Sequence, residues 1–522
     1  MTKNSRTKNS IINILTSTGG QLLNIILKFV VRTVFIHALG KQYLGINGLF
    51  SDILTMLSLT ELGFDTAINF KLYKPLADGD KKRLRVLMKF YKQAYRIIGT
   101  IILLLGLGMV PLLPKVINDY DSLETLRINA VVIFLLHILR TVSSYLFFAY
   151  KSAIIKADQK QYILDIVDYF VEVANSVVQI LVLVFTKNFV LYTATMIFFS
   201  ILRNLINAVI AQKRYPEVFR KEEDRISKDE IVGLLKDCAA LFVYKLNAVV
   251  LKATDNIVLS TFIGITIVGV YSNYLLFFNT LRSLLLKFYT AVKASAGNLF
   301  AVADLKAKYQ FFQVMNYITV IIYGTAGVGL AVCSNELVDT WIGPDYIIPQ
   351  PFAILIGIEL LFYGLMNNLG QIRNISGVFR QMWYRPLLGT IINLVVSVIL
   401  VQSYGICGVI LGTIISTICS NFIVDPQVIH KYSFNNYRPV SEYYKKNLQY
   451  IIVLALGGAF DMWLCSIFLA GRGWLSVIVH ALVVSVTIPA IFVILYRKSV
   501  EYNYIKGIAM RVLGKARAKL AK

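Results

Sequence analysis

Long apolar runs restrict the fold of this sequence more than any other feature. A helix needs about 20 mostly apolar residues to cross the hydrocarbon core of a bilayer. Because the chain is 57% apolar and only 16% charged, it could not cover its surface with polar groups in water. We therefore expect an all-α, polytopic membrane protein with about 14 transmembrane helices. The predicted spans are 13–36, 44–68, 95–114, 128–149, 162–185, 189–210, 239–262, 268–292, 311–333, 351–372, 386–403, 405–424, 447–469 and 475–496.

Lysine and arginine are distributed unevenly among the connections between these spans. If the amino terminus lies in the cytosol, the inner segments hold 39 of the 53 Lys and Arg residues and the outer segments hold 5. Positive residues accumulate in short cytoplasmic loops. The sequence therefore predicts that both termini are cytoplasmic and that the excess charge meets anionic membrane lipids. Because the net charge of +24 lies in short clusters and forms no basic domain, no nucleic-acid partner is expected.

An internal repeat indicates how the helices are grouped. Gly40 and Gly45, between the first two spans, map onto Gly264 and Gly269, between the seventh and eighth, at one offset of 224 residues. Spans 1 and 7 both run outward, so the halves would be parallel repeats, as in transporters that move two lobes around a central site. We expect two pseudo-symmetric six-helix lobes and a C-terminal helix pair. The predicted domains are 1–211 (N-terminal lobe), 212–236 (cytoplasmic linker), 237–430 (C-terminal lobe) and 431–522 (extra helix pair and basic tail).

Ionisable residues inside the predicted spans are the candidate functional residues. Each costs about 2.5–3.5 kcal/mol at the bilayer centre and normally faces the bundle interior or a water-filled cavity. The candidate cations of such a cavity are Lys28, Arg32, Arg140, Lys252 and Arg282. The candidate carboxylates for ion coupling or gating are Asp255, Glu61, Asp65 and Glu359.

These residue types suit an anionic headgroup. A guanidinium binds a diphosphate bidentately, and lysine adds point charge. The carboxylates would pair with the cations at rest or exchange ions during a cycle, which leaves a proton and a sodium gradient both open, and no bound cofactor is expected. The alternative for Asp65 and Arg203, near span ends, is snorkelling to the interface. The acidic stripe Asp165, Asp168 and Glu172 could equally be a solvated or packing face.

Sequence signals for catalysis are missing. The chain has no Gly-x-x-x-x-Gly-Lys-Ser/Thr loop for nucleotide phosphates and no His-Glu-x-x-His, and its four histidines lack metal-ligand spacing. The outer connections are short, whereas a membrane glycan polymerase or ligase usually needs a larger outer loop. We therefore expect a transporter and no enzyme, with such a polymerase or ligase as the alternative from another class.

Several short motifs resemble a known family in their order and spacing. They are Leu39-Gly40 with Tyr43-Leu-Gly45-Ile, Thr60-Glu-Leu-Gly-Phe-Asp65, Thr254-Asp255-Asn-Ile-Val-Leu-Ser, Trp341-Ile-Gly343-Pro and Tyr404-Gly-Ile-Cys-Gly408. Through them the chain resembles the bacterial polysaccharide flippases of the O-antigen, capsule and exopolysaccharide type. These flippases belong to the multidrug/oligosaccharidyl-lipid/polysaccharide exporter superfamily. The likeness covers roughly residues 11–426 and the additional helix pair.

The resemblance implies alternating access by two six-helix lobes in the cytoplasmic membrane of a bacterium. The implied cargo is an undecaprenyl-diphosphate-linked oligosaccharide for cell-surface polysaccharide biosynthesis, and other polysaccharide-assembly proteins are implied partners. Relatives carry cavity cations on spans 1 and 8, which by position correspond to Lys28 or Arg32 and to Arg282. Within transport, the alternative is a drug or cation antiporter of the same superfamily.

Overall fold

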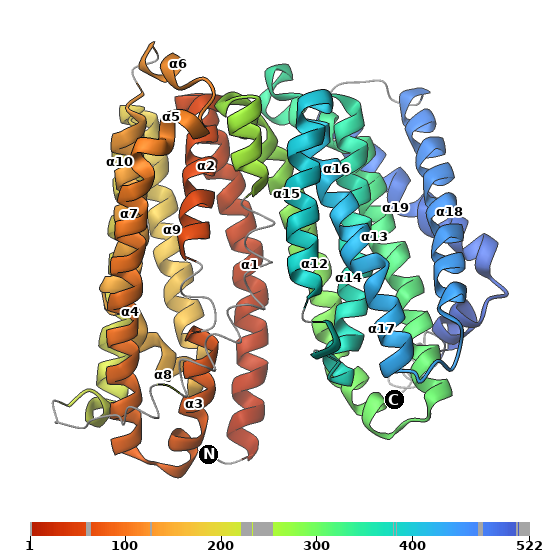
Figure 1. Cartoon of the computed structure of the whole chain (residues 1–522), viewed down its shortest axis with the longest axis horizontal. Helices are drawn as coiled ribbons and strands as arrows, with labels where there is room; N and C mark the ends of the chain where they lie inside the picture. Colours follow the sequence, from red (N-terminus) through yellow and green to blue (C-terminus); the bar gives the residue numbers. More distant parts are fainter. Residues whose placement is uncertain are drawn as a thin grey trace, which may run out of the picture. The chain divides into compact units, whose positions relative to one another are not determined.

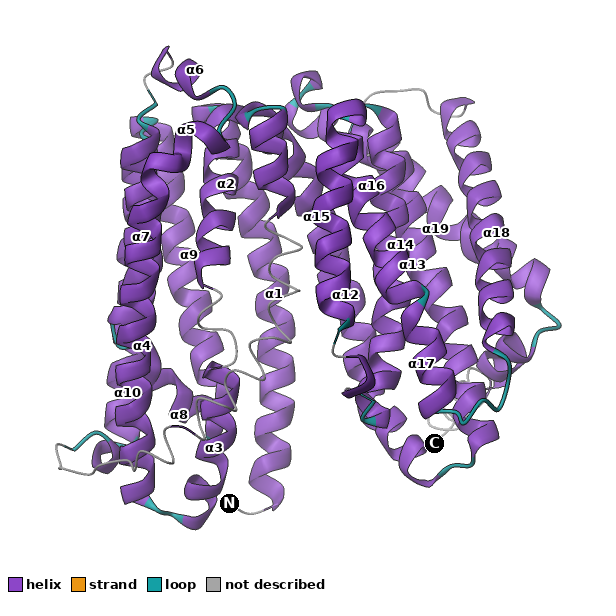
Figure 2. Ribbon diagram, in the orientation of Figure 1, coloured by secondary structure: helices purple, strands orange, loops and turns teal. Residues whose placement is uncertain are grey.

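The computed structural model describes residues 3–58, 64–125, 128–220, 254–378, 380–382, 384–467 and 473–507, together with Val232 and Met510. All regular elements within these residues are helices (Figure 2). The chain divides into two compact units, Met1–Gly269 and Val270–Lys522. The predicted all-α fold class is confirmed.

Unit 1 is built around long helices that lie side by side (Figure 1). Its elements are α1 (Lys3–Leu39), α2 (Lys41–Leu57), α3 (Phe64–Asp78), α4 (Lys81–Met109), η2 (Val110–Leu112), α5 (Leu113–Val116), α6 (Tyr120–Thr125), α7 (Ala130–Leu146), η3 (Ala149–Lys151), α8 (Ser152–Ala157), α9 (Gln161–Thr186), α10 (Phe189–Arg214) and η4 (Pro216–Val218). Within the unit α1 packs on α9, and α7 packs on both α4 and α10.

Helix α12 begins at the end of unit 1 and continues into unit 2, which extends to the end of the chain. Its elements are α12 (Ile265–Val302), α13 (Leu305–Ile342), η5 (Pro344–Tyr346), α14 (Gln350–Ser376), η6 (Arg380–Met382), α15 (Arg385–Tyr404), α16 (Ile406–Thr417), the π-helical η7 (Ile418–Phe422), α17 (Val424–Tyr432), α18 (Val440–Ile467) and α19 (Trp474–Tyr496). The long helix α13 is central, because α14, α18 and α19 all pack against it.

Ten helices in the described residues are long and apolar enough to cross a membrane. An eleventh span is formed if α7 and the segment Ala149–Ala157, bent by 42°, are taken together. These coincide with predicted spans 1, 3–6 and 9–14. Predicted span 8 lies within α12, and span 2 corresponds to α2 and the start of α3 with undescribed residues between them. Most of span 7 lies outside the described residues.

Helix starts in both units are fixed by polar caps. The Asp80 carboxylate accepts a hydrogen bond from the backbone N–H of Arg83 at 2.8 Å, and the Asp304 carboxylate accepts one from Ala307 at 2.8 Å. Asn188 accepts two such bonds at the start of α10. Each cap stabilises its helix by about 1 kcal/mol. The caps therefore separate α4, α10 and α13 from the helices that precede them.

The repeat predicted from the sequence has a structural counterpart at the starts of α2 and α12. Gly40 precedes α2 with φ of 85°, and Gly264 precedes α12 with φ of 127°. These dihedral angles are accessible to glycine and strained for residues with a Cβ atom. The two helix starts therefore use the same residue type, in the same region of φ, at the same repeat position.

The next pair of repeat glycines brings α2 and α12 into direct contact. A Cβ atom on Gly45 would lie 2.0 Å from the carbonyl oxygen of Ile265, and one on Gly269 would lie 2.1 Å from the carbonyl oxygen of Lys41. Lys41 and Ile265 are themselves 224 residues apart. The contact is thus reciprocal, and it follows the small-residue mode by which membrane helices approach closely.

Glycines also set the packing around α13. Gly327 of α13 and Gly357 of α14 face each other so closely that a Cβ atom on either would lie 2.5 Å or less from the carbonyl oxygen of the other. A Cβ atom on Gly458 of α18 would lie 3.3 Å from Val328 of α13. Close backbone approach therefore holds α14 and α18 against the same central helix.

Candidate functional site

Two of the predicted cavity arginines, on different helices of unit 1, interact electrostatically with the same tyrosine. Arg32 on α1 and Arg140 on α7 are both half-buried. Both interact electrostatically with Tyr192 of α10, whose side chain is 6% exposed. A phenol hydroxyl can accept hydrogen bonds but carries no charge at neutral pH. Tyr192 therefore lies within electrostatic range of both guanidinium groups without neutralising them.

Aromatic packing holds this tyrosine in place. The Tyr192 ring lies 5.0 Å from that of Phe35, one turn after Arg32 on α1, in an edge-to-face arrangement. Phe189, one turn earlier on α10, lies 5.9 Å from Tyr192 and 5.8 Å from Phe35. Such ring pairs add about 0.5–1.5 kcal/mol each beyond their buried area. The arrangement fixes the distance between α1 and α10 beside the arginines.

The acidic stripe of α9 faces the same group. Glu172 interacts electrostatically with Arg140. Asp168 pairs with Arg203 of α10 at 3.8 Å, and both side chains are about two-fifths exposed. Asp165 accepts a hydrogen bond from Gln161 at 2.9 Å. The stripe therefore contributes to packing between α9 and α10 and also reaches the arginine group.

Asp255 lies in a second polar region of unit 1, and its side chain is 9% exposed. Its neighbour Asn256 donates a hydrogen bond to the carboxylate of Asp52 on α2. The Asp119 carboxylate accepts a bond at 3.0 Å from the backbone N–H of Ile265, the first residue of α12. This network fixes the segment before α12 against α2 and the connection after α5. The segment that contains Asp255 is thereby held in place. The role of Asp255 in ion coupling stays a prediction.

In unit 2, Arg282 and Glu359 lie close to each other. The guanidinium carbon of Arg282 lies 4.1 Å from the ring centroid of Tyr363, within cation–π distance. Glu359, one turn before Tyr363 on α14, interacts electrostatically with Arg282, as does Tyr323 of α13. Arg282 is half-buried. A guanidinium stacked on a ring keeps its N–H groups at the edge of the plane, where they can bind an anion.

The remaining predicted site residues are not assigned to either of these two groups. Lys28 lies on an exposed part of α1. Lys252 and Glu61 lie outside the described residues, and Asp65 lies in α3, with no description of its side chain. The structure therefore groups Arg32 with Arg140 in unit 1 and Arg282 with Glu359 in unit 2.

A buried ionic cluster in unit 2 was not predicted from the sequence. Arg373 at the end of α14 and Arg385 at the start of α15 are each 8% exposed, and Asp425 of α17 is 0% exposed. A guanidinium nitrogen of Arg385 lies 3.2 Å from an Asp425 carboxylate oxygen, and one of Arg373 lies 3.9 Å from the same oxygen. Arg385 also donates a hydrogen bond to the Asn421 side chain at 2.6 Å. The predicted spans 351–372 and 386–403 place both arginines in the connection between them. In the structure α14 and α15 extend past these ends and bury both side chains.

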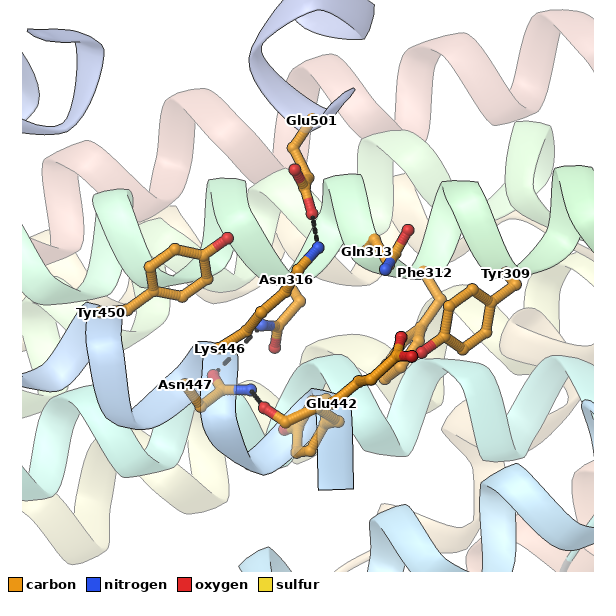
Figure 3. Close-up of a pocket in the computed structure, with 10 residues that line it drawn as sticks. Tyr309, Phe312, Gln313, Asn316, Glu442, Lys446, Asn447, Tyr450 and Glu501 are labelled. Atoms are coloured by element: carbon orange, nitrogen blue, oxygen red, sulfur yellow. Dashed lines mark hydrogen bonds and ion pairs between the residues drawn. The ribbon is translucent and has the colours of Figure 1, made fainter. Parts of the chain in front are cut away.

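A small pocket lies where α13, α18 and the segment after α19 meet (Figure 3). Lys446 forms an ion pair with Glu501, whose side chain is 2% exposed, and the Asn316 amide donates to Asn447 at 3.1 Å. The ion pair attaches the segment after α19 to α18, and the amide bond joins α13 to α18. The described residues contain no group of three His, Cys, Asp or Glu side chains that could hold a metal ion.

Comparisons with known proteins identify the fold. No protein-family profile matches the chain, and no curated protein sequence does. The structure is similar to that of the lipid II flippase MurJ in an inward closed conformation, with a TM-score of 0.64 over 93% of this chain and 99% of the other, at 16% identity.

Two drug transporters are similar as well. An inward-facing multidrug resistance MATE family transporter of the MOP superfamily has a TM-score of 0.57 over 80% of this chain and 96% of its own, at 12% identity. A MATE transporter from Vibrio cholerae has a TM-score of 0.53 over 82% and 98%, at 13% identity. The chain thus has the same polytopic helical fold as these flippase and transporter structures.

Proposed function

We propose that this protein is a flippase that moves an undecaprenyl-diphosphate-linked oligosaccharide across a bacterial cytoplasmic membrane by alternating access, for cell-surface polysaccharide biosynthesis. The observation that carries the proposal is that Arg32 and Arg140, both half-buried in unit 1, interact electrostatically with the same residue, Tyr192. Two guanidinium groups beside an uncharged hydroxyl are suited to a diphosphate, whose oxygens accept bidentate hydrogen bonds. The fold it shares with a lipid II flippase supports a lipid-linked cargo.

In this mechanism the protein replaces the water that the headgroup loses. A bare diphosphate cannot enter hydrocarbon, and the two arginines of unit 1 would offer charge-assisted hydrogen bonds in compensation. Arg282, held against Tyr363, would offer N–H donors of the same kind within unit 2. Glu359 would occupy Arg282 when no cargo is bound. The oligosaccharide would follow the headgroup, and the lipid tail would stay in the bilayer.

The proposed orientation places both termini and the Lys- and Arg-rich connections in the cytosol, as the charge distribution predicts. Cargo would then load from the cytoplasmic leaflet. Anionic lipids and the proteins that extend the polysaccharide are the proposed partners.

The test is flipping of a lipid-linked oligosaccharide in proteoliposomes. We expect Arg32→Ala, Arg140→Ala and Arg282→Ala each to lower the initial flipping rate by about 10–100-fold, because a hydrogen bond to a charged group contributes about 1.5–3 kcal/mol. The Lys variants, which keep the charge and lose the bidentate geometry, should lose less. Arg438→Ala is the matched control, since Arg438 is exposed and forms an ion pair with Glu442, four residues further along the chain.

Rates equal to wild type in all three Ala variants would contradict the cation-site mechanism. The MATE likeness keeps a drug or cation antiporter as the second candidate. The same vesicles therefore need a second arm with a fluorescent cationic drug. Drug uptake without movement of the lipid-linked oligosaccharide would replace the flippase proposal with the antiporter.

A further inference from the structure

The interface of α13, α18 and α19 contains a buried acid that the proposed mechanism does not use. Asp461 lies in the apolar helix α18, and its side chain is 0% exposed. One turn earlier, Gly457 packs against Ile488 of α19 and Gly458 against Val328 of α13. The acid is therefore enclosed by two close helix contacts, in a region where a carboxylate is costly unless it is paired or protonated.

The hydrogen-bonding geometry of Thr487 determines where a proton lies. The Thr487 hydroxyl oxygen is 2.7 Å from an oxygen of Asp461 and 2.9 Å from the carbonyl oxygen of Val483. A hydroxyl has a single proton to donate. If Thr487 donates to Val483, the short contact with Asp461 is a hydrogen bond only when the carboxylic acid is the donor. If Thr487 donates to an ionised Asp461, its single proton must be shared with Val483 or withdrawn from it, so each hydrogen bond is weakened or one is lost.

The protonated arrangement is the one that satisfies both contacts. In it the Asp461 O–H donates to Thr487, Thr487 donates to Val483, and no charge is buried. In the ionised arrangement one hydrogen bond would have to stabilise a full charge, since Oδ1 of Asp461 has no hydrogen-bond partner among the described residues. Desolvation of a carboxylate costs far more than one hydrogen bond returns. The geometry thus corresponds to Asp461 with its proton bound.

Other ionisable groups face the same interface. Nδ1 of His480 on α19 lies 2.7 Å from a carboxylate oxygen of Glu336 on α13. Cys465, one turn after Asp461, interacts electrostatically with both Asp461 and Glu336, and Cys333 of α13 belongs to the same group. All three helices therefore contribute titratable side chains. The His480–Glu336 pair provides a nearby imidazole and carboxylate that can take up a proton.

We propose that Asp461 is a proton-binding site of the transport cycle and that the proton is the coupling ion. This inference rests on the proposed transport function. On release the Asp461 O–H bond breaks, the proton passes to water or to the His480–Glu336 pair, and the Thr487 hydroxyl turns from Val483 to Asp461. The new charge is accommodated only if α18 and α19 shift against α13 and admit water. Protonation and helix packing are thereby linked.

The first test is infrared spectroscopy of the purified full-length protein, which needs no cargo. We expect wild type at neutral pH to show a protonated-carboxyl C=O band that Asp461→Asn removes. Thr487→Val should shift this band to higher frequency, because the acid loses its acceptor. Asp345→Asn is the matched control and should leave the band unchanged, since Asp345 is exposed on η5. A band unchanged in Asp461→Asn would overturn the proposal.

The second test is flipping in proteoliposomes with an imposed pH gradient or an imposed sodium gradient. We expect the pH gradient to accelerate flipping several-fold in wild type and in Asp345→Asn and to have no effect in Asp461→Asn. Dependence on pH that persists in Asp461→Asn, or dependence on sodium alone, would overturn the role of Asp461. If wild type moves no lipid-linked oligosaccharide at all, the proposed function fails while the infrared result stands separately.

Discussion

The arginines inside the two units interact with different kinds of side chain. In unit 1, Arg32 and Arg140 are half-buried and interact electrostatically with Tyr192, and Arg140 also interacts with Glu172. In unit 2, Arg373 and Arg385 converge on one oxygen of Asp425. A half-buried arginine near a neutral hydroxyl keeps more of its charge for a ligand, whereas a carboxylate shared by two buried arginines neutralises part of their charge and ties helices together. We infer that the partner of a buried arginine determines whether its charge can bind a ligand or mainly holds helices together.

The comparison is tested most strongly by removing the acid in unit 2. Asp425→Ala should destabilise the protein by about 3–5 kcal/mol, because it leaves two guanidinium groups buried without their carboxylate. Thermal unfolding in detergent would measure this, with Asp345→Ala, an exposed aspartate, as the control. Replacing Arg373, Arg385 and Asp425 together by apolar residues of similar volume should restore most of the stability. A triple variant that folds well but cannot transport would show that the cluster also binds a ligand.

A smaller effect is expected at the exposed ion pair of unit 1. A double-mutant cycle on Arg203→Ala and Asp168→Ala should give a coupling free energy of about 0.2–1 kcal/mol, because both side chains are partly solvated. The free energy of unfolding of the four proteins is the measurement. A coupling of several kcal/mol would mean that α9 and α10 are held in the same way as α14 and α17, and the contrast between the units would be lost.

The smallest effect is expected at the surface of unit 1, at the ion pair between Lys81 and Glu217. The hydrogen bond and charge of Lys81 hold the pKa of Glu217 below its ordinary value. A lowered pKa in the folded state stabilises the protein above the ordinary pKa of glutamate, and the contribution is lost as the pH falls through the lowered value. The difference in melting temperature between wild type and Glu217→Gln should therefore be small at neutral pH and vanish on acidification. A difference that grows in acid would contradict this assignment.

Much of the fold could be predicted because lipid imposes a simple rule on sequence. Every backbone polar group must be satisfied within the segment, so a span has to be an apolar helix of a minimum length. The repeat could also be predicted from the sequence, because Gly45 and Gly269 are needed for close backbone contact at equivalent positions. The bend between α7 and α8 was not predicted, because the apolar run continues across it.

The candidate site could be predicted only in part. Arg32 and Arg140 were recognisable as charges inside spans, but their shared interaction with Tyr192 depends on how α1, α7 and α10 pack. Arg373 and Arg385 were misassigned to a loop because the positive-residue rule counts them there, and helices α14 and α15 extend beyond the predicted ends to bury them. Asp461 was overlooked although it interrupts an apolar run. Burial and partners are properties of the tertiary structure, and residue type alone does not give them.

The reciprocal contact of Gly45 and Gly269 makes two positions 224 residues apart in the sequence depend on each other. Each glycine leaves room for the backbone beside the other, so a methyl group at one position displaces the helix that carries the other. Neither position can be relieved by shortening a neighbouring side chain, because the obstacle is main chain. A second substitution at the partner glycine would add a clash and could not compensate for the first.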